Sequence, residues 1–204
     1  MEKNPDDITG WEAFGEALIR TGSYTEALKC YDIVTAQRPD ALNGWLRKTD
    51  CLERLARYAD AAAAAEKALS LETGDRVLRE RAARLHLRAG NTTDALTYLI
   101  QVLKFSPDNA ELLTLIGDAQ ERAGMRKEAA DTYARVLELN EDSVAVAMRF
   151  AALCESLGRF GEAAEAYRRV AMAMPENPAP DTTGPPPSSG KGTIVNVRSR
   201  SISW

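Results

Sequence analysis

Residues 8–41, ITGWEAFGEALIRTGSYTEALKCYDIVTAQRPDA, decide the fold, because their pattern returns along most of the chain. In the first half, apolar residues recur three and four positions apart, which is the spacing of one face of a helix. Gly22 follows, and glycine readily adopts the left-handed conformation that ends many helices. A second helical pattern covers residues 24–36 and stops before Pro39. The stretch predicts two helices joined by a tight turn.

The same 34-residue pattern recurs in phase over residues 8–177. The turn position holds glycine in four units and alanine in the second, in the order Gly22, Ala56, Gly90, Gly124 and Gly158. Five positions later every unit has an alanine: Ala27, Ala61, Ala95, Ala129 and Ala163. Such a period indicates tandem repeats, each too thin to fold alone. The units are residues 8–41, 42–75, 76–109, 110–143 and 144–177.

These units resemble the tetratricopeptide repeat. The first carries the family pattern at Trp11, Phe14, Gly15, Leu18, Gly22, Tyr24, Ala27, Tyr31 and Pro39. The resemblance implies an all-α fold, a right-handed superhelical α-α solenoid of five helix-turn-helix repeats with an irregular C-terminal tail. The second repeat departs most, because Lys48 and Thr49 replace the usual leucine and glycine and its second helix lacks a large ring. We expect it to be thinner and less stable.

The two ends of the chain differ from the repeats. Residues 1–7 contain Pro-Asp-Asp in the register of a closing turn, so either the array is cut from a longer protein or a natural start keeps this turn as a cap. Residues 178–192 are rich in proline, glycine and serine and read as a linker. Residues 193–204 alternate apolar and polar residues and form a basic, strand-like tail. The segment from residue 178 carries a formal charge of +2, which leaves −6 on the array.

Composition narrows the class of protein. The chain has 204 residues, a formal net charge of −4 and only 6% aromatic residues. The negative charge opposes nucleic-acid binding, although related helical repeats do read RNA bases. No apolar stretch approaches the roughly 20 residues of a membrane span, and the polar, acidic start does not resemble a signal peptide. We therefore expect a cytoplasmic protein with no membrane and no nucleic-acid partner.

Residues suited to catalysis or metal binding are sparse. The single histidine, His86, falls on the packed side of a predicted helix, and the three cysteines, Cys30, Cys51 and Cys154, are scattered over different repeats. The Gly-Lys pair at Gly190-Lys191 lacks the strand-loop-helix context of a phosphate-binding loop. We expect no enzyme activity, no catalytic residue, no cofactor and no metal.

The resemblance implies a concave groove lined by the first helix of each repeat. The residues at groove positions are Thr9, Glu12, Glu16, Asn43, Leu46, Asp50, Val77, Glu80, Arg84, Glu111, Thr114, Asp118, Ala145, Met148 and Ala152. Family members that clamp the acidic tails of chaperones use a lysine and an asparagine on successive first helices. No such pair occurs here, whichever repeat of this chain is aligned with the first repeat of those proteins. The acidic and apolar mixture instead favours a protein or peptide partner with basic and apolar residues.

A second ladder recurs at 34 residues on the same helices: Arg20, Arg54, Arg88 and Arg122. One interpretation is a row of guanidinium groups for an acidic or phosphorylated ligand. The other is that these arginines stabilise helix C-termini and pair with acidic residues four positions earlier. The sequence favours the second interpretation.

The leading functional hypothesis is a noncatalytic protein-protein interaction scaffold. The alternatives are a structural self-associating segment and a regulatory module of a larger multidomain protein. The candidate residues for self-association lie near the last repeat and in the tail: Val170, Met172, Met174, Ile202 and Trp204. Opposite charges further suggest that the basic tail docks on an acidic array, its own or a neighbour's.

Overall fold

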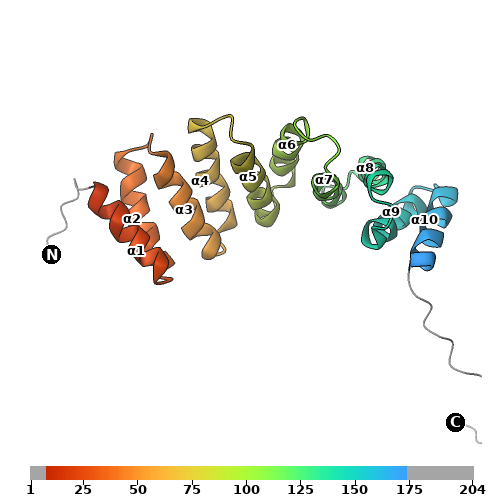
Figure 1. Cartoon of the computed structure of the whole chain (residues 1–204), viewed down its shortest axis with the longest axis horizontal. Coiled ribbons are helices and arrows are strands. Elements are labelled where there is room, and N and C mark those ends of the chain that lie inside the picture. The colour runs from red at the N-terminus through yellow and green to blue at the C-terminus, as the bar shows by residue number, and fades with distance from the viewer. Residues whose placement is uncertain (1–7, 174–204) are drawn as a thin grey trace, which may run out of the picture. The chain divides into compact units, whose positions relative to one another are not determined.

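A computed structural model describes residues 8–173, and these form ten α-helices in tandem pairs (Figure 1). The helices are α1 (Ile8–Arg20), α2 (Tyr24–Gln37), α3 (Leu42–Arg54), α4 (Tyr58–Leu71), α5 (Arg76–Ala89), α6 (Thr92–Leu103), α7 (Ala110–Arg122), α8 (Arg126–Leu139), α9 (Val144–Ser156) and α10 (Phe160–Ala173). We call the odd-numbered helices A helices and the even-numbered ones B helices. The predicted all-α fold of five helix pairs is confirmed. The predicted closing turn at residues 1–7, most of the last repeat's final turn, the linker and the tail lie outside the described residues.

Every turn between an A helix and its B helix has the same backbone geometry. The turn residue has a positive φ at Gly22, Gly90, Gly124 and Gly158, and also at Ala56, where φ is 57°. The amide of Ala56 bonds the Glu53 carbonyl at 3.0 Å, and the amide of Arg57 bonds the Leu52 carbonyl at 2.9 Å. Equivalent bonds close the other four turns, a pattern known as the Schellman motif. The second repeat therefore keeps the turn despite losing the glycine.

Glycine brings the two helices of a pair close together in repeats one and four. A Cβ built on Gly15 would lie 2.8 Å from a ring carbon of Tyr31, and one on Gly117 would lie 2.5 Å from a ring carbon of Tyr133. Both tyrosines are almost completely buried. The absent side chain on one helix thus makes room for the ring on the other.

In the second repeat the close approach of the two helices is packed with different side-chain volumes. Thr49 occupies the place of Gly15, and Ala65 occupies the place of Tyr31. Both are fully buried, and the Thr49 hydroxyl donates to the Trp45 carbonyl at 2.8 Å. A larger residue on the A helix is therefore matched by a smaller one on the B helix. The expected lower stability of this repeat stays a prediction.

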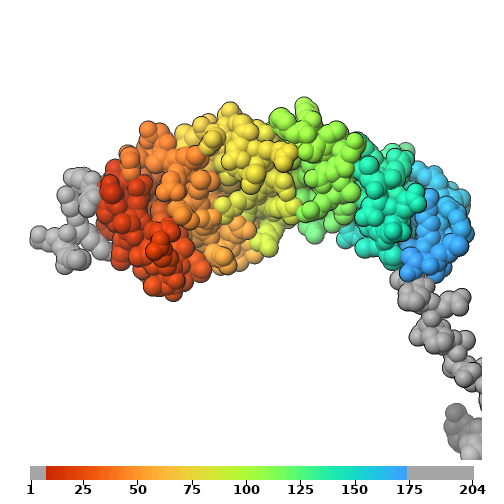
Figure 2. All heavy atoms as spheres, in the orientation of Figure 1, coloured from red at the N-terminus to blue at the C-terminus, as the bar shows by residue number. Residues whose placement is uncertain are grey.

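The buried side chains form three clusters along the row of helices. The first joins helices α2 to α5, the second is centred on α6 and α7, and the third runs from α7 to α10. Figure 2 shows the corresponding segments packed in chain order from red to blue. No helix between residues 8 and 173 has both the length and the apolar character needed to cross a membrane.

Candidate functional site

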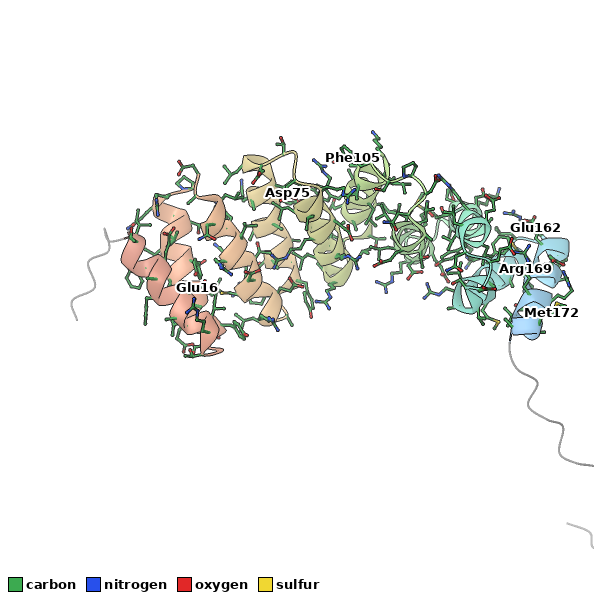
Figure 3. The ribbon with its side chains drawn as sticks, in the orientation of Figure 1. Glu16, Asp75, Phe105, Glu162, Arg169 and Met172 are labelled. Atoms are coloured by element: carbon green, nitrogen blue, oxygen red, sulfur yellow. The ribbon has the colours of Figure 1, made fainter. Side chains whose placement is uncertain are left out.

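The predicted groove residues lie together on the surface of the A helices. They recur on α1, α3, α5, α7 and α9 at equivalent positions, and none of them is buried. We call this surface the A-helix face. Figure 3 marks Glu16 on α1 as one of its members. The A-helix face therefore has the exposure that a binding surface needs.

Two clefts open on the A-helix face. The first has a volume of about 580 Å³ and is lined by residues of α1, α2, α3 and α5, among them Asp50. The second has a volume of about 370 Å³ and is lined by α7, α8 and α9, with Met148 and Ala152 in its wall. Three predicted groove residues thus line clefts in the structure.

Three of the six predicted acidic groove residues are held in ion pairs with the following repeat. Glu16 lies 3.3 Å from Arg47, Asp50 lies 2.6 Å from Arg81, and Asp118 contacts Arg149. In each pair the carboxylate belongs to one A helix and the arginine to the next. These partly exposed pairs form a ladder between repeats, so the carboxylates are not available as isolated charges.

The ladder reverses its polarity between repeats three and four. Arg84 occupies the carboxylate position there, and Leu115 occupies the arginine position. Arg84 instead contacts Glu80 on its own helix at 2.8 Å and Glu111 on the next A helix at 3.1 Å. Its hydrogen bond to Glu80, followed by that to Glu111, raises the pKa of the Arg84 guanidinium despite the opposing effect of desolvation. The predicted groove residues Glu80, Arg84 and Glu111 thus form one cluster.

The first cleft is richer in arginine than the sequence suggested. Arg47, Arg54, Arg81 and Arg88 line it, against the carboxylates of Asp50 and Glu53. Burial opposes the charge of Arg81, but hydrogen bonds from its guanidinium to Asp50 and Glu53 outweigh that cost and raise its pKa. The cleft wall therefore carries more positive than negative groups.

The expected ion pairs of the second arginine ladder are seen only in part. Arg20 lies 3.9 Å from Glu16, as the spacing of four predicts. Asp50 and Asp118 pair with Arg81 and Arg149 instead. Arg54 lies over the ring of Tyr24 at 6.0 Å, and Arg88 lies over Tyr58 at 5.0 Å and 3.4 Å from Glu53. The predicted i,i+4 ion pairs of Arg54 and Arg122 are therefore wrong, because Asp50 and Asp118 contact arginines of the next repeat, whereas the predicted placement of both arginines in the last turn of a helix is confirmed.

Sequence reasoning missed Arg47, Arg81 and Arg149, although a signal for them exists. They share one register of 34 residues, interrupted by Leu115. Because Arg149 also donates to the hydroxyl of the buried Tyr133 at 3.0 Å, it links the surface ladder to the core. Burial and the hydrogen bond to Asp118 raise the pKa of that hydroxyl. Searching each helical position for a recurring charge would have found this register.

The histidine and the three cysteines are buried in the described array. His86 is 4% exposed, and its Nε2 lies 3.0 Å from Glu66, which also accepts a bond from the Tyr98 hydroxyl at 3.0 Å. All three cysteines are buried and free. Burial raises the pKa of the Cys51 thiol to about 11 and also raises that of Cys154. Such thiols are poor nucleophiles at neutral pH.

The self-association candidates differ in their exposure. Met172 is 74% exposed near the end of α10, where Figure 3 labels it, whereas Val170 is buried in the core. Met174, Ile202 and Trp204 lie outside the described residues. Of the described candidates, only Met172 offers apolar surface.

A stack of helix pairs that presents one face of its A helices defines a class of helical repeat proteins. A family model for the tetratricopeptide repeat matches residues 12–75, 80–143 and 122–178. The chain belongs to the tetratricopeptide repeat family. No curated protein sequence matches it.

Solved structures show the same fold at low sequence identity. MamA 41-end from Desulfovibrio magneticus RS-1 is 18% identical, with a TM-score of 0.64 over 82% of this chain and 95% of that one. Another MamA structure is 14% identical, with a TM-score of 0.67 over 81% and 91% of the two chains. YrrB, a TPR protein with an unusual peptide-binding site, is 19% identical, with a TM-score of 0.66 over 86% and 91%. These likenesses concern the fold.

Proposed function

We propose that this protein is a noncatalytic scaffold that binds a segment of another protein on its A-helix face. The observation that carries the proposal is the pair of clefts that open between successive A helices. A family built from stacked helix pairs uses such surfaces for recognition. The similarity in fold to a TPR protein with a peptide-binding site is consistent with this role.

The charges of the first cleft suggest the chemistry of the partner. The carboxylates of Glu16 and Asp50 already contact Arg47 and Arg81, so a basic partner would have to displace these arginines. Arg54 lies over the ring of Tyr24. Arg88 lies over the ring of Tyr58 and, among residues 8–173, forms one ion pair, with Glu53 at 3.4 Å. Guanidinium groups bind carboxylates and phosphates well. We therefore propose an acidic group on the partner at Arg54 and Arg88, in place of the basic residues that the sequence favoured.

The second cleft adds an apolar contact. Met148 and Leu153 line it together with Ala152, and Met148 is 43% exposed. Methionine adapts its shape to different apolar surfaces. A partner segment with an acidic group near repeat two and an apolar residue near repeat five fits both clefts.

Affinity capture from native lysate tests this function with paired variants. Arg54→Glu/Arg88→Glu reverses two charges on the A-helix face. Lys29→Glu/Lys127→Glu makes the same change in net charge at exposed positions of the B helices. We expect the first variant to lose partners that the native chain and the control variant retain. Equal recovery by all three chains would contradict binding at this face.

A third variant tests the other partner chemistry. Glu12→Lys/Glu16→Lys reverses acidic residues of the same face. Loss of the partner in this variant alone would show that a basic segment binds, and our choice of an acidic partner would then be wrong.

A further inference from the structure

The first cleft of the A-helix face has an excess of positive charge. Four arginines and two carboxylates line it, which leaves two formal positive charges without a negative partner. Glu16 contacts Arg47 from outside this lining, but Glu16 also contacts Arg20, so counting both leaves the excess unchanged. A ligand group with two negative charges would match this cleft.

Three other clefts in residues 8–173 carry less positive charge. In the second cleft, Arg126 and Arg149 face Glu121, and Arg149 also contacts Asp118 outside the lining, so the charges balance. A cleft of about 310 Å³ lined by α2, α3 and α4 has three basic and two acidic residues. A cleft of about 370 Å³ lined by α8, α9 and α10 has one arginine and four glutamates. The first cleft is the most positive of these four.

Arg54 and Arg88 are the arginines of the first cleft with spare hydrogen-bond donors. Arg54 forms no ion pair with any residue in the range 8–173, and Arg88 forms one, with Glu53 at 3.4 Å. Arg47 and Arg81, by contrast, each contact two carboxylates. Because a guanidinium has five N–H donors in a planar fork, most donors of Arg54 and Arg88 have no carboxylate acceptor.

A tyrosine ring contacts each of these two guanidinium groups. Arg54 lies over Tyr24 and Arg88 lies over Tyr58, and each ring belongs to the B helix of the preceding repeat. The face of a ring attracts the cation but offers no oxygen to its N–H groups. The contact therefore restricts the arginine side chain and leaves its donors available to an oxyanion.

A phosphate monoester fits this arrangement better than a carboxylate. It carries a charge of about −1.5 to −2 at pH 7, whereas a carboxylate carries a single charge. Its three terminal oxygens can accept paired hydrogen bonds from two guanidinium groups at once. A nucleic acid also carries phosphates, but the net charge of −4 on this chain opposes a ligand with many phosphates in a row. These observations favour one phosphate on a protein segment.

We propose that the segment bound on the A-helix face carries a phosphorylated side chain, and that Arg54 and Arg88 bind its phosphate in the first cleft. This proposal rests on the proposed function and narrows the acidic group of the partner to a phosphate monoester. Binding then requires that a kinase has modified the partner, and a phosphatase acting on the partner ends it.

Side-chain NMR of the full-length chain tests the phosphate site. The probes are three five-residue glycine peptides whose central residue is phosphoserine, aspartate or serine. We expect the Nε–H signals of Arg54 and Arg88 to shift, with saturation, when the phosphoserine peptide is added. The aspartate peptide should bind about tenfold more weakly, because it lacks one charge and one acceptor oxygen. The serine peptide should cause no shift.

The pH dependence of binding separates a phosphate from a carboxylate. The second pKa of a phosphorylated side chain is about 6, so lowering the pH from about 7.5 to about 5.5 removes most of its second charge. The affinity of the phosphoserine peptide should then fall severalfold. The aspartate peptide stays ionised over this range, because its pKa is about 4, and its affinity should not change. It also reports any effect of pH on the protein itself.

Matched variants locate the phosphate, with affinity measured from backbone amide shifts in the first cleft. Arg54→Gln/Arg88→Gln should weaken binding of the phosphoserine peptide by about tenfold or more. The control Arg122→Gln/Arg126→Gln removes the same charge at exposed positions on α7 and in the second cleft. Arg122 shares the register of Arg54, but Thr92 stands in place of the tyrosine ring. The control should bind like the native chain.

Three results would overturn the phosphate assignment. The first is the absence of a saturable shift at Arg54 and Arg88 with the phosphoserine peptide. The second is equal binding of the phosphoserine and aspartate peptides at both pH values. The third is tighter binding of a short single-stranded RNA than of the phosphoserine peptide, because that would assign the cleft to a nucleic acid.

Capture from lysate treated with a protein phosphatase separates this proposal from the proposed function. A partner that is lost with Arg54→Gln/Arg88→Gln but survives the phosphatase would overturn the phosphate and keep the scaffold. Equal recovery by the native chain and this variant, with or without the phosphatase, would contradict binding at this face altogether. Loss of the same partner through either the variant or the phosphatase is the result we expect.

Discussion

Ala56 is the single residue outside glycine with a positive φ in the part of the chain that the structure describes. A side chain with a Cβ is strained in this left-handed region by about 1 kcal/mol or more. The turn nevertheless keeps this conformation. The Ala56 amide donates to the Glu53 carbonyl and the Arg57 amide donates to the Leu52 carbonyl, and these bonds are equivalent to those of the glycine turns. The second repeat therefore carries a local strain that the other repeats avoid.

Ala56→Gly should raise the free energy of unfolding by about 1 kcal/mol, because glycine adopts this φ without strain. Equilibrium urea unfolding measures the change. The reverse change, Gly124→Ala, should lower it by a similar amount, and it is a clean control because a Cβ there meets nothing within 4 Å. Unchanged stability in both variants would show that the turn relaxes around alanine.

Gly117→Ala should destabilise the protein by about 1–3 kcal/mol, the usual cost of overpacking a core. The added Cβ would lie 2.5 Å from the ring of Tyr133, which is fully buried and cannot move aside. Gly161→Ala is the matched control, because it adds the same methyl group to a helix where nothing lies within 4 Å. Thermal unfolding of both variants should show a lower midpoint for the first and an equal or higher midpoint for the second.

At the scale of the helix, neighbouring A helices are joined by the ladder of ion pairs. Arg81 is its best-connected member, since it contacts both Asp50 at 2.6 Å and Glu53 at 3.0 Å. These side chains stay about one-third exposed, so solvent weakens each pair. We therefore expect the ladder to contribute only modestly to stability.

A double-mutant cycle on Asp50→Asn and Arg81→Gln should give a coupling energy of about 0.5–1 kcal/mol. Urea unfolding at low and high salt measures it, and the coupling should fall at high salt because the pair is partly solvated. The same cycle on Asp50 and Arg54 should give little coupling, although sequence spacing predicts that pair. A stronger coupling to Arg54 than to Arg81 would show that the ladder is misassigned.

Helix bounds and turn positions could be predicted from the sequence because they depend on local signals. Pro39 and Gly22 mark the ends of α2 and α1, and their effects act within one turn. The partners of Asp50 could not be predicted in this way. Within a helix Arg54 is a neighbour by spacing, yet Arg81 of the next repeat is the residue that reaches the carboxylate. Which arginine pairs with Asp50 depends on how the repeats stack. The distance from Asp50 to Arg81 of the next repeat cannot be derived from the sequence of one helix alone.

At the scale of the whole array, the buried residues change cluster near α6. The cluster that spans α6 and α7 is the smallest of the three, and the ion-pair ladder reverses at the same junction. A repeat array is stabilised by its repeats and by the contacts between neighbours. We therefore expect the junction between repeats three and four to be the least stable junction of the described array.

Native-state hydrogen exchange should reveal this junction as a boundary. We expect amides of α2 to α5 to exchange with one free energy of opening and amides of α8 to α10 with another. Leu99→Ala, which removes a fully buried side chain at the boundary, should separate the two values further. Ala119→Gly, also on the small cluster, provides a second variant with less lost volume. A single opening free energy throughout, unchanged by either variant, would show that the array unfolds as one unit.

The shared turn geometry and the matched side-chain volumes of the two helices in a pair limit which segments two repeats can exchange by recombination. Recombination between two copies of the 34-residue unit should leave the turn inside each helix pair intact, because these five turns use the same bonds. A crossover inside a helix pair would set Thr49 against Tyr133, or Gly117 against Ala65, and would leave a clash or a hole. A crossover between pairs keeps each glycine with its own ring. We therefore expect the helix pair to be the unit that recombination exchanges. Recombined arrays that fold should keep each A helix with its own B helix.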